Sequence, residues 1–367
     1  MCQGIVKWKG VTVKTVKIMK NSRAWRAFAI VCEAVAVIAL ILGCQNTGQN
    51  DLPLSGKKFA IVVKSEGNSY FERIIEGFCA VVESQGGIPV VREPTHATAE
   101  EQIRIINTLI SDKVDSIAIA TNSESAVAPM LHKAIGQGTK VISFDSAAEV
   151  SSRALHVNQA NAQLIAKALM DAAADITGGS GQIAIMSTTN QASNQNKWIS
   201  EMRGLLEAEV YPGLMLVSIV YGEDDYQVTY NKTQDLIDTY PDLALIIAPT
   251  AAGIPAVAEC IISNGMQQRI KVTGLGMPSQ MAQYIGYDKV CPYMFLWDLD
   301  EVGKLTAYAA IALVNGTISG EVGETLSAGE MGEYYITLDP FGGSEIVLQA
   351  EPVRFDESNI DDWKSVY

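Results

Sequence analysis

The chain has 367 residues and a formal net charge of −14 at pH 7. A chain of this length exceeds one ordinary hydrophobic core, so we expect two lobes or domains. A negative field of this kind repels polyanions and argues against a nucleic-acid partner. The composition favours a soluble body that binds a neutral ligand.

An apolar run from Ala27 to Leu42 follows a basic stretch at the N-terminus. Basic residues, an apolar run and then a small residue are the order found in secretory signal peptides. The end of the run, Ile41-Leu-Gly-Cys44, resembles a bacterial lipobox. We therefore predict a signal peptide with a lipobox over residues 1–43, lipid attachment at Cys44, and a polar tether over residues 44–57.

Two alternatives stay open for this segment. Met19 could be the start of translation in place of Met1. The apolar run approaches the lower length limit of a membrane span, so an uncleaved anchor is the alternative to cleavage, although Glu33 interrupts the run. Either way the body is expected outside the cytoplasm, and we predict that the lipid is its only attachment to the membrane.

The body opens with the apolar run Phe59–Val63, which is typical of a parallel strand covered on both faces. A polar loop follows, and an apolar stripe at helical spacing begins at Phe71. Ligands of open α/β sheets bind at the carboxyl ends of the strands. Lys64, Asn68, Tyr70 and Phe71 are therefore candidate ligand contacts. The alternative is a solvated loop in which the two aromatic residues belong to the core.

Strands and helices then alternate without interruption, which predicts a doubly wound lobe. The expected strands are 88–91, 116–120 and 140–144, and the expected helices are 99–110 and 125–135. The last strand ends at Asp145. A carboxylate at this edge can accept hydrogen bonds from two hydroxyl groups of a polyol.

The same pattern starts again at Gln182, after a helix over about 160–176, which suggests a duplicated lobe. The second series comprises strands 182–186, 215–221, 243–248 and 270–274, with helices to about 209, at 226–239 and at 254–263. Asn194 and Gln195 in one loop, and Pro249 and Ala251 in another, are candidate contacts for a hydroxyl-rich ligand. Helix capping and a plain turn are the alternatives for these two loops.

After a strand at 290–296 the chain reaches Trp297, and a helix at 302–314 and strands at 334–338 and 346–349 follow. This back-and-forth course predicts an α/β fold of two doubly wound parallel-sheet lobes joined by a multi-strand hinge, which can close by bending. The predicted division has an N-terminal lobe of residues 58–157 and 298–335, a C-terminal lobe of residues 158–297 and 336–353, and a tail of residues 354–367.

The remaining cysteines and the histidines show no ligand spacing, so we predict neither a metal site nor a cofactor. Cys79, Cys260 and Cys291 lie among apolar neighbours and are expected to be buried hydrophobic residues. The converging loops contain no nucleophile with a neighbouring base and no glycine-rich phosphate loop, so no catalytic residue is predicted.

Several motifs give the chain a family resemblance from about Lys58 to Trp363. Asn68-Ser-Tyr-Phe71, Val141-Ile-Ser-Phe-Asp145 and Ile246-Ile-Ala-Pro249 resemble those of periplasmic sugar-binding proteins of the ribose-binding type, the substrate-binding lipoproteins of ABC importers. The resemblance implies the fold of type I periplasmic binding proteins. It is greatest to the branch of the autoinducer-2-binding and rhamnose-binding proteins, and the motifs that indicate this branch are Asn194-Gln-Asn-Lys-Trp198, Ala248-Pro-Thr-Ala251, Phe295-Leu-Trp-Asp298 and Phe355-Asp-Glu-Ser-Asn-Ile360.

The resemblance also implies a ligand set. By position, the autoinducer-2 contacts correspond to Lys64, Asp145, Asn194, Gln195, Pro249 and Ala251. Asn194 departs from that pattern, because the autoinducer-2 binders carry an aspartate there; a deoxyhexose such as rhamnose stays open as the ligand. Trp297, Tyr70 or Phe71 is expected to stack on the apolar face of a sugar.

The expected function is therefore that of an extracytoplasmic, lipid-anchored monomer. It would capture a small neutral carbohydrate or furanosyl signal molecule and deliver it to the permease of an ABC importer. A ligand-bound signalling partner of a membrane receptor is one alternative. An enzyme on the same architecture is another, since fold alone does not determine function.

Overall fold

The computed structural model describes residues 54–367. The predicted signal peptide, Cys44 and most of the predicted tether lie outside the described residues. The tether was expected to reach residue 57, but Leu54 is fully buried in the core and its amide donates to the Gln85 carbonyl oxygen. Residues 54–57 therefore belong to the packed body.

The first lobe, which we call the N-terminal lobe, is built on a seven-stranded sheet of order β13-β14-β5-β4-β3-β1-β2. Its elements are β1 (Lys58–Val62), α2 (Ser69–Ser84), β2 (Ile88–Arg92), α3 (Ala99–Ser111), β3 (Ser116–Ile119), α4 (Glu124–Gly136), β4 (Lys140–Phe144), β5 (His156–Ala160), α10 (Leu299–Asn315), β13 (Thr337–Leu338) and β14 (Ser344–Gln349).

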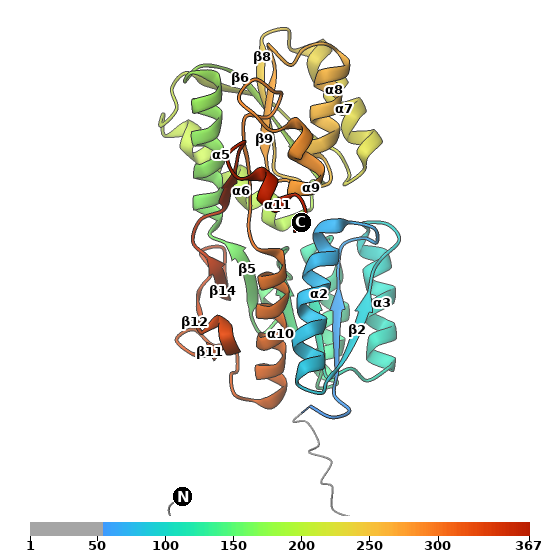
Figure 1. Cartoon of the computed structure of the whole chain (residues 1–367). Coiled ribbons are helices and arrows are strands. Elements are labelled where there is room, and N and C mark those ends of the chain that lie inside the picture. The colour runs from blue at the N-terminus through green and yellow to red at the C-terminus, as the bar shows by residue number, and fades with distance from the viewer. Residues whose placement is uncertain (1–53) are drawn as a thin grey trace, which may run out of the picture. The chain divides into compact units, whose positions relative to one another are not determined.

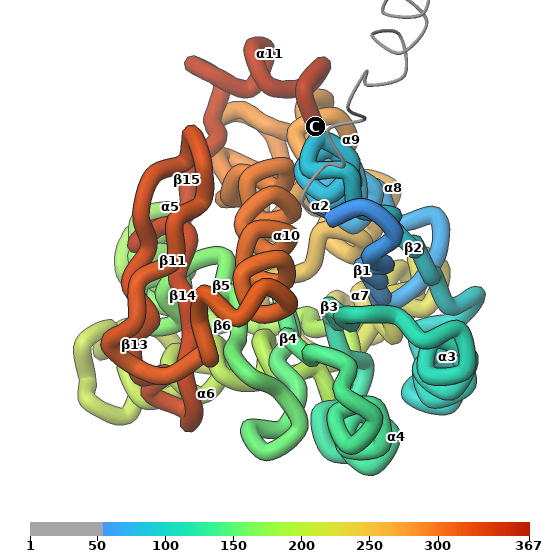
Figure 2. The backbone as a smooth tube through the Cα atoms, turned by 90° about the horizontal axis from the view of Figure 1, so that it is seen from below, coloured from blue at the N-terminus to red at the C-terminus, as the bar shows by residue number. Residues whose placement is uncertain are grey.

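Helices cover both faces of this sheet, as consecutive apolar residues in a parallel strand require. Phe59 and Ile61 of β1 join the core that includes residues of α2 and α10, whereas Ala60 and Val62 join a second core with residues of α3 and α4. Helix α10 lies beside α2 in both views (Figures 1 and 2). The sheet is therefore central to its lobe.

The second lobe, the C-terminal lobe, has a four-stranded sheet of order β7-β6-β8-β9, and all its pairs are parallel. Helices α5 and α6 pack together, as do α7 and α8. The elements are α5 (Ala162–Thr177), β6 (Gly181–Ser187), α6 (Ser193–Glu207), β7 (Leu214–Tyr221), α7 (Tyr226–Thr239), β8 (Leu243–Ala248), α8 (Ile254–Ser263), β9 (Lys271–Gly274), α9 (Pro278–Met281) and β10 (Met294–Leu296).

The chain passes between the lobes three times: from β5 to α5, from β10 to α10, and from β14 to β15 (Val353–Phe355). β15 pairs antiparallel with β10, and the short helix α11 (Ile360–Trp363) contacts α9, so the tail packs on the C-terminal lobe. A small hairpin of β11 (Thr325–Ser327) and β12 (Glu333–Tyr335) packs on α10 and β14. The predicted α/β fold of two doubly wound lobes with a multi-strand hinge is confirmed.

The structure differs from the predicted division at two segments. Residues 158–160 were assigned to the C-terminal lobe, but they belong to β5 of the seven-stranded sheet. Residues 336–353 were assigned to the C-terminal lobe, but β13 and β14 extend the seven-stranded sheet of the N-terminal lobe. The reason is strand β5, which was not among the predicted strands. It forms an edge with which β14 pairs in parallel from Glu345↔His156 to Gln349↔Ala160.

Two further observations concern the described residues alone. Cys79, Cys260 and Cys291 are free thiols, of which the last two are buried. Across residues 54–367, every helix is too short or too polar to span a membrane.

Candidate functional site

A pocket with a volume of ≈ 50 Å³ lies between the carboxyl ends of the parallel strands of the two sheets. All ten predicted contact residues line it: Lys64, Asn68, Tyr70, Phe71, Asp145, Asn194, Gln195, Pro249, Ala251 and Trp297. The structure therefore brings these residues together, while their role in binding stays a prediction.

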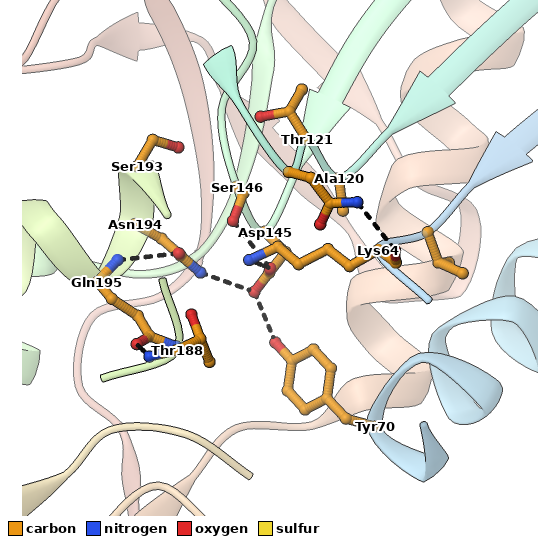
Figure 3. A network of polar contacts seen from close by, with 12 residues as sticks. Lys64, Tyr70, Ala120, Thr121, Asp145, Ser146, Thr188, Ser193, Asn194 and Gln195 are labelled. Atoms are coloured by element: carbon orange, nitrogen blue, oxygen red, sulfur yellow. Dashed lines mark hydrogen bonds and ion pairs between the residues drawn. The ribbon is translucent and has the colours of Figure 1, made fainter. Parts of the chain in front are cut away.

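Asp145 is the polar centre of the pocket (Figure 3). It follows β4 with φ 54°, a left-handed backbone that aspartate tolerates better than most residues and that recurs at ligand sites. The Tyr70 hydroxyl donates to Oδ1 at 2.9 Å, and the Asn194 Nδ2 donates to the same oxygen at 3.2 Å. Lys64 Nζ lies 3.6 Å from Oδ2.

Lys64 and Asp145 form a buried ion pair, with relative exposures of 9% and 4%. Lys64 stands at the end of β1, and its carbonyl oxygen accepts from Asn122 Nδ2 at 2.9 Å. The buried Gln102 amide joins the ends of β1 and β3 by donating to the carbonyl oxygens of Val63 and Ala120. The strand ends that carry the charges are therefore held in place.

The opposite wall of the pocket comes from the first turn of α6. Asn194 and Gln195 lie inside this helix rather than in the predicted loop. Gln195 Oε1 accepts from Ser187 Oγ at 2.6 Å and from the Thr188 amide at 2.9 Å, which leaves its Nε2 donor for a ligand. The capping alternative does not hold here, because Ala192 is the N-cap of α6 and no side chain caps it.

Aromatic rings form the apolar wall. Trp297 is 2% exposed, and its ring centroid lies 6.0 Å from that of Trp198 and 6.3 Å from that of Tyr70. Trp297 Nε1 donates to the Tyr70 hydroxyl at 3.0 Å. Burial and the neighbouring Asp145 raise the pKa of Tyr70 well above its ordinary value, so this hydroxyl remains a neutral donor.

Sequence reasoning missed a second carboxylate, Asp224, which lines the pocket from the turn between β7 and α7. Asn68 Nδ2 donates to its Oδ2 at 3.4 Å across the two lobes. Burial raises the pKa of Asp224, the Lys64 charge opposes this, and Asp145 adds to it. Asp224 follows the carboxyl end of β7, where ligands of parallel sheets bind, so this rule could have indicated it.

Other residues that line the pocket were not predicted either. They are Thr188, Trp198, Thr250, Ala252, Leu275 and Leu296. Trp198 lies four residues after Asn194, on the same face of α6, so helical spacing alone could have indicated it. In the part of the chain that the structure describes, no cluster of three or more histidine, cysteine or carboxylate groups is placed to hold a metal ion.

The site as a whole combines amide, hydroxyl and carboxylate groups on one side with aromatic rings on the other. Such a pocket can receive hydrogen bonds from the hydroxyl groups of a ligand while covering its C–H face. The single positive charge of Lys64 lies near the two negative charges of Asp145 and Asp224, so the pocket does not suit an anionic ligand.

Solved structures resemble the chain over most of its length. An ABC transporter solute-binding protein from Clostridium phytofermentas with bound L-rhamnose is 44% identical, and the alignment covers 86% of this chain and 100% of that one with a TM-score of 0.83. LsrB from Clostridium saccharobutylicum in complex with AI-2 is 20% identical over 83% of this chain and 99% of that one, with a TM-score of 0.78, and shows the fold alone.

Two sequence comparisons agree with this result. The D-ribose/D-allose-binding protein of Pseudomonas aeruginosa is 22% identical over 231 residues, which are 59% of this chain and 70% of that protein. The model of the periplasmic binding protein domain matches residues 59–318, which contain the strands from β2 to β10 and helix α10. The chain belongs to the periplasmic binding protein family.

Proposed function

We propose that this protein is the solute-binding component of a sugar ABC importer and that its ligand is a neutral deoxyhexose of the L-rhamnose type. The observation that carries the proposal is the pocket itself, which places polar groups of both lobes opposite the rings of Trp198 and Trp297. The rhamnose complex, at 44% identity, supports this ligand class.

A deoxyhexose suits the two kinds of wall. Its hydroxyl groups would meet Asn194, Gln195, Thr188 and the carboxylates. Its methyl group and C–H face would meet the aromatic rings and the neighbouring leucines of the pocket. An autoinducer-2-type ligand is the second candidate, but it is favoured less because Asn194 replaces the acidic residue of that pattern.

Contacts between the lobes support capture by closure. On one side of the pocket, Gln280 Nε2 donates to Ser69 Oγ at 3.0 Å. On another, Lys197 Nζ lies 3.1 Å from Asp339 Oδ2 and 4.7 Å from the centroid of the Phe341 ring. Each contact joins one lobe to the other and is lost when they separate. We therefore assign this arrangement to the closed state, which would deliver the ligand to a permease.

Isothermal titration with L-rhamnose tests the proposed ligand, and small-angle scattering on the same sample tests closure. We expect saturable one-to-one binding by a monomer and a smaller radius of gyration with ligand than without. Autoinducer-2 with borate, D-ribose and D-glucose serve as comparison ligands. Failure of L-rhamnose to bind, or tighter binding of a comparison ligand, would overturn the assignment.

The lipid anchor forms a separate prediction. This prediction rests on the motif Ile41-Leu-Gly-Cys44. Lipid attached to Cys44 would hold the body at the outer face of the membrane. Cys44→Ala should abolish labelling by a fatty-acid analogue in cells, whereas Cys79→Ala, which removes a thiol of the packed body, should leave labelling unchanged. Persistent labelling of the first variant would contradict the lipobox.

A further inference from the structure

The two carboxylates of the pocket differ in how much hydrogen-bonding capacity they have left. Asp145 Oδ1 already accepts hydrogen bonds from three side chains: the Tyr70 hydroxyl at 2.9 Å, Asn194 Nδ2 at 3.2 Å and Gln159 Nε2 at 3.3 Å. Oδ2 accepts from Ser146 Oγ at 3.3 Å and faces Lys64 at 3.6 Å. A carboxylate offers about four lone-pair sites, so Asp145 is close to saturated by the protein itself.

Asp224 has far fewer partners. Its Oδ2 accepts from Asn68 Nδ2 at 3.4 Å, near the upper limit for a hydrogen bond. The Thr250 side chain, whose Oγ1 accepts from the Gly253 amide, also lowers the pKa of Asp224. Asp224 lines the pocket and can therefore accept at least one further hydrogen bond there.

The backbone holds Asp224 in place at some conformational cost. Glu223 and Asp224 both have φ 56°, and two consecutive non-glycine residues in this region are strained. The Glu223 amide donates to the Thr188 carbonyl oxygen at 2.8 Å, and the Gly222 amide donates to that of Ser187 at 2.8 Å. The turn is thus tied to the same segment that orients Gln195, which keeps the carboxylate at the pocket wall.

We propose that Asp224 is a further carboxylate that binds the sugar directly, by accepting hydrogen bonds from its hydroxyl groups, whereas Asp145 in addition organises Lys64, Tyr70 and Asn194. This inference rests on the proposed function and specifies how the same site selects its ligand. A sugar hydroxyl that donates to Asp224 takes the place of the long hydrogen bond from Asn68. The pocket therefore discriminates against sugars that lack this hydroxyl.

Isothermal titration of Asp224→Asn with L-rhamnose tests the assignment, because the amide keeps the size of the side chain but removes the charge and one acceptor. We expect affinity to fall about tenfold to a hundredfold. Asp225→Asn is the matched control: Asp225 is exposed and caps α7 through the Val228 amide, and asparagine caps equally well. Its affinity should equal that of the wild type.

Deoxy analogues separate direct contact from an indirect effect. Among 2-, 3- and 4-deoxy-L-rhamnose, at least one should bind the wild type markedly more weakly than L-rhamnose, and this penalty should largely vanish in Asp224→Asn. The ligand-free variant should melt at the same temperature or higher, because it no longer places a second negative charge near Asp145.

The outcomes are distinguishable. The assignment is overturned, while the proposed function stands, if Asp224→Asn binds L-rhamnose as tightly as the wild type does. The same holds if the deoxy analogue loses as much affinity in Asp224→Asn as in the wild type. A wild-type protein that does not bind L-rhamnose overturns the proposed function and this inference together.

Discussion

Asp145→Ala is expected to weaken L-rhamnose binding by at least about a hundredfold, which corresponds to about 2.7 kcal/mol. The substitution removes the acceptor that Tyr70 and Asn194 share and leaves the buried Lys64 without its partner. Removing one member of a buried ion pair typically costs about 3–5 kcal/mol. The loss therefore arises from the disorganised polar wall as well as from any direct contact.

Isothermal titration measures this effect, and the melting temperature of the ligand-free variant monitors folding. Asp112→Ala is the control, since Asp112 lies in the same lobe, and its side chain is 46% exposed and 3.8 Å from Arg92 Nη2. Asp145→Asn should give an intermediate loss because it keeps the shape and one acceptor. Affinity within threefold of the wild type in a folded Asp145→Ala variant would refute the central role of this carboxylate.

Much of the fold could be predicted because the apolar pattern is regular. The runs at 140–144 and 243–248 are β4 and β8 to the residue, since each is bounded by polar or turn residues. The pocket residues that were predicted at the ends of strands followed from one rule, that parallel strands present ligand loops at their carboxyl ends. This rule located Lys64 after β1 and Asp145 after β4 without any knowledge of the lobes' arrangement.

The remaining features depend on contacts between distant segments. Strand β14 pairs with β5 across almost two hundred residues. A strand was predicted at 346–349, but the local pattern does not show with which strand it pairs. The Asn68–Asp224 bond joins two lobes, so neither side chain reveals the other. The start of α6 before Asn194 was missed because Ala192, a poor N-cap, precedes it.

Asn194→Asp is the second substitution with a large expected effect, because it would put a carboxylate where the Asn194 amide now donates to Asp145 Oδ1 at 3.2 Å. Two carboxylates this close cannot both ionise easily, so one pKa of the pair should rise. At pH 7.5 we expect L-rhamnose affinity to fall at least about tenfold, since the donor is lost and repulsion is gained.

The pH dependence of this variant identifies the cause. As pH falls through the raised pKa, the pair gains a proton, and the protonated carboxyl group introduced by Asn194→Asp can again donate to Asp145. The ratio of variant to wild-type dissociation constants should therefore shrink between pH 7.5 and pH 5. Asn194→Ala is the control: it removes the donor without adding charge, so its ratio should not change with pH. Equal ratios for Asn194→Asp at both pH values would exclude the carboxylate pair. Tighter autoinducer-2 binding by the same variant would instead show that this position decides between the two ligand classes.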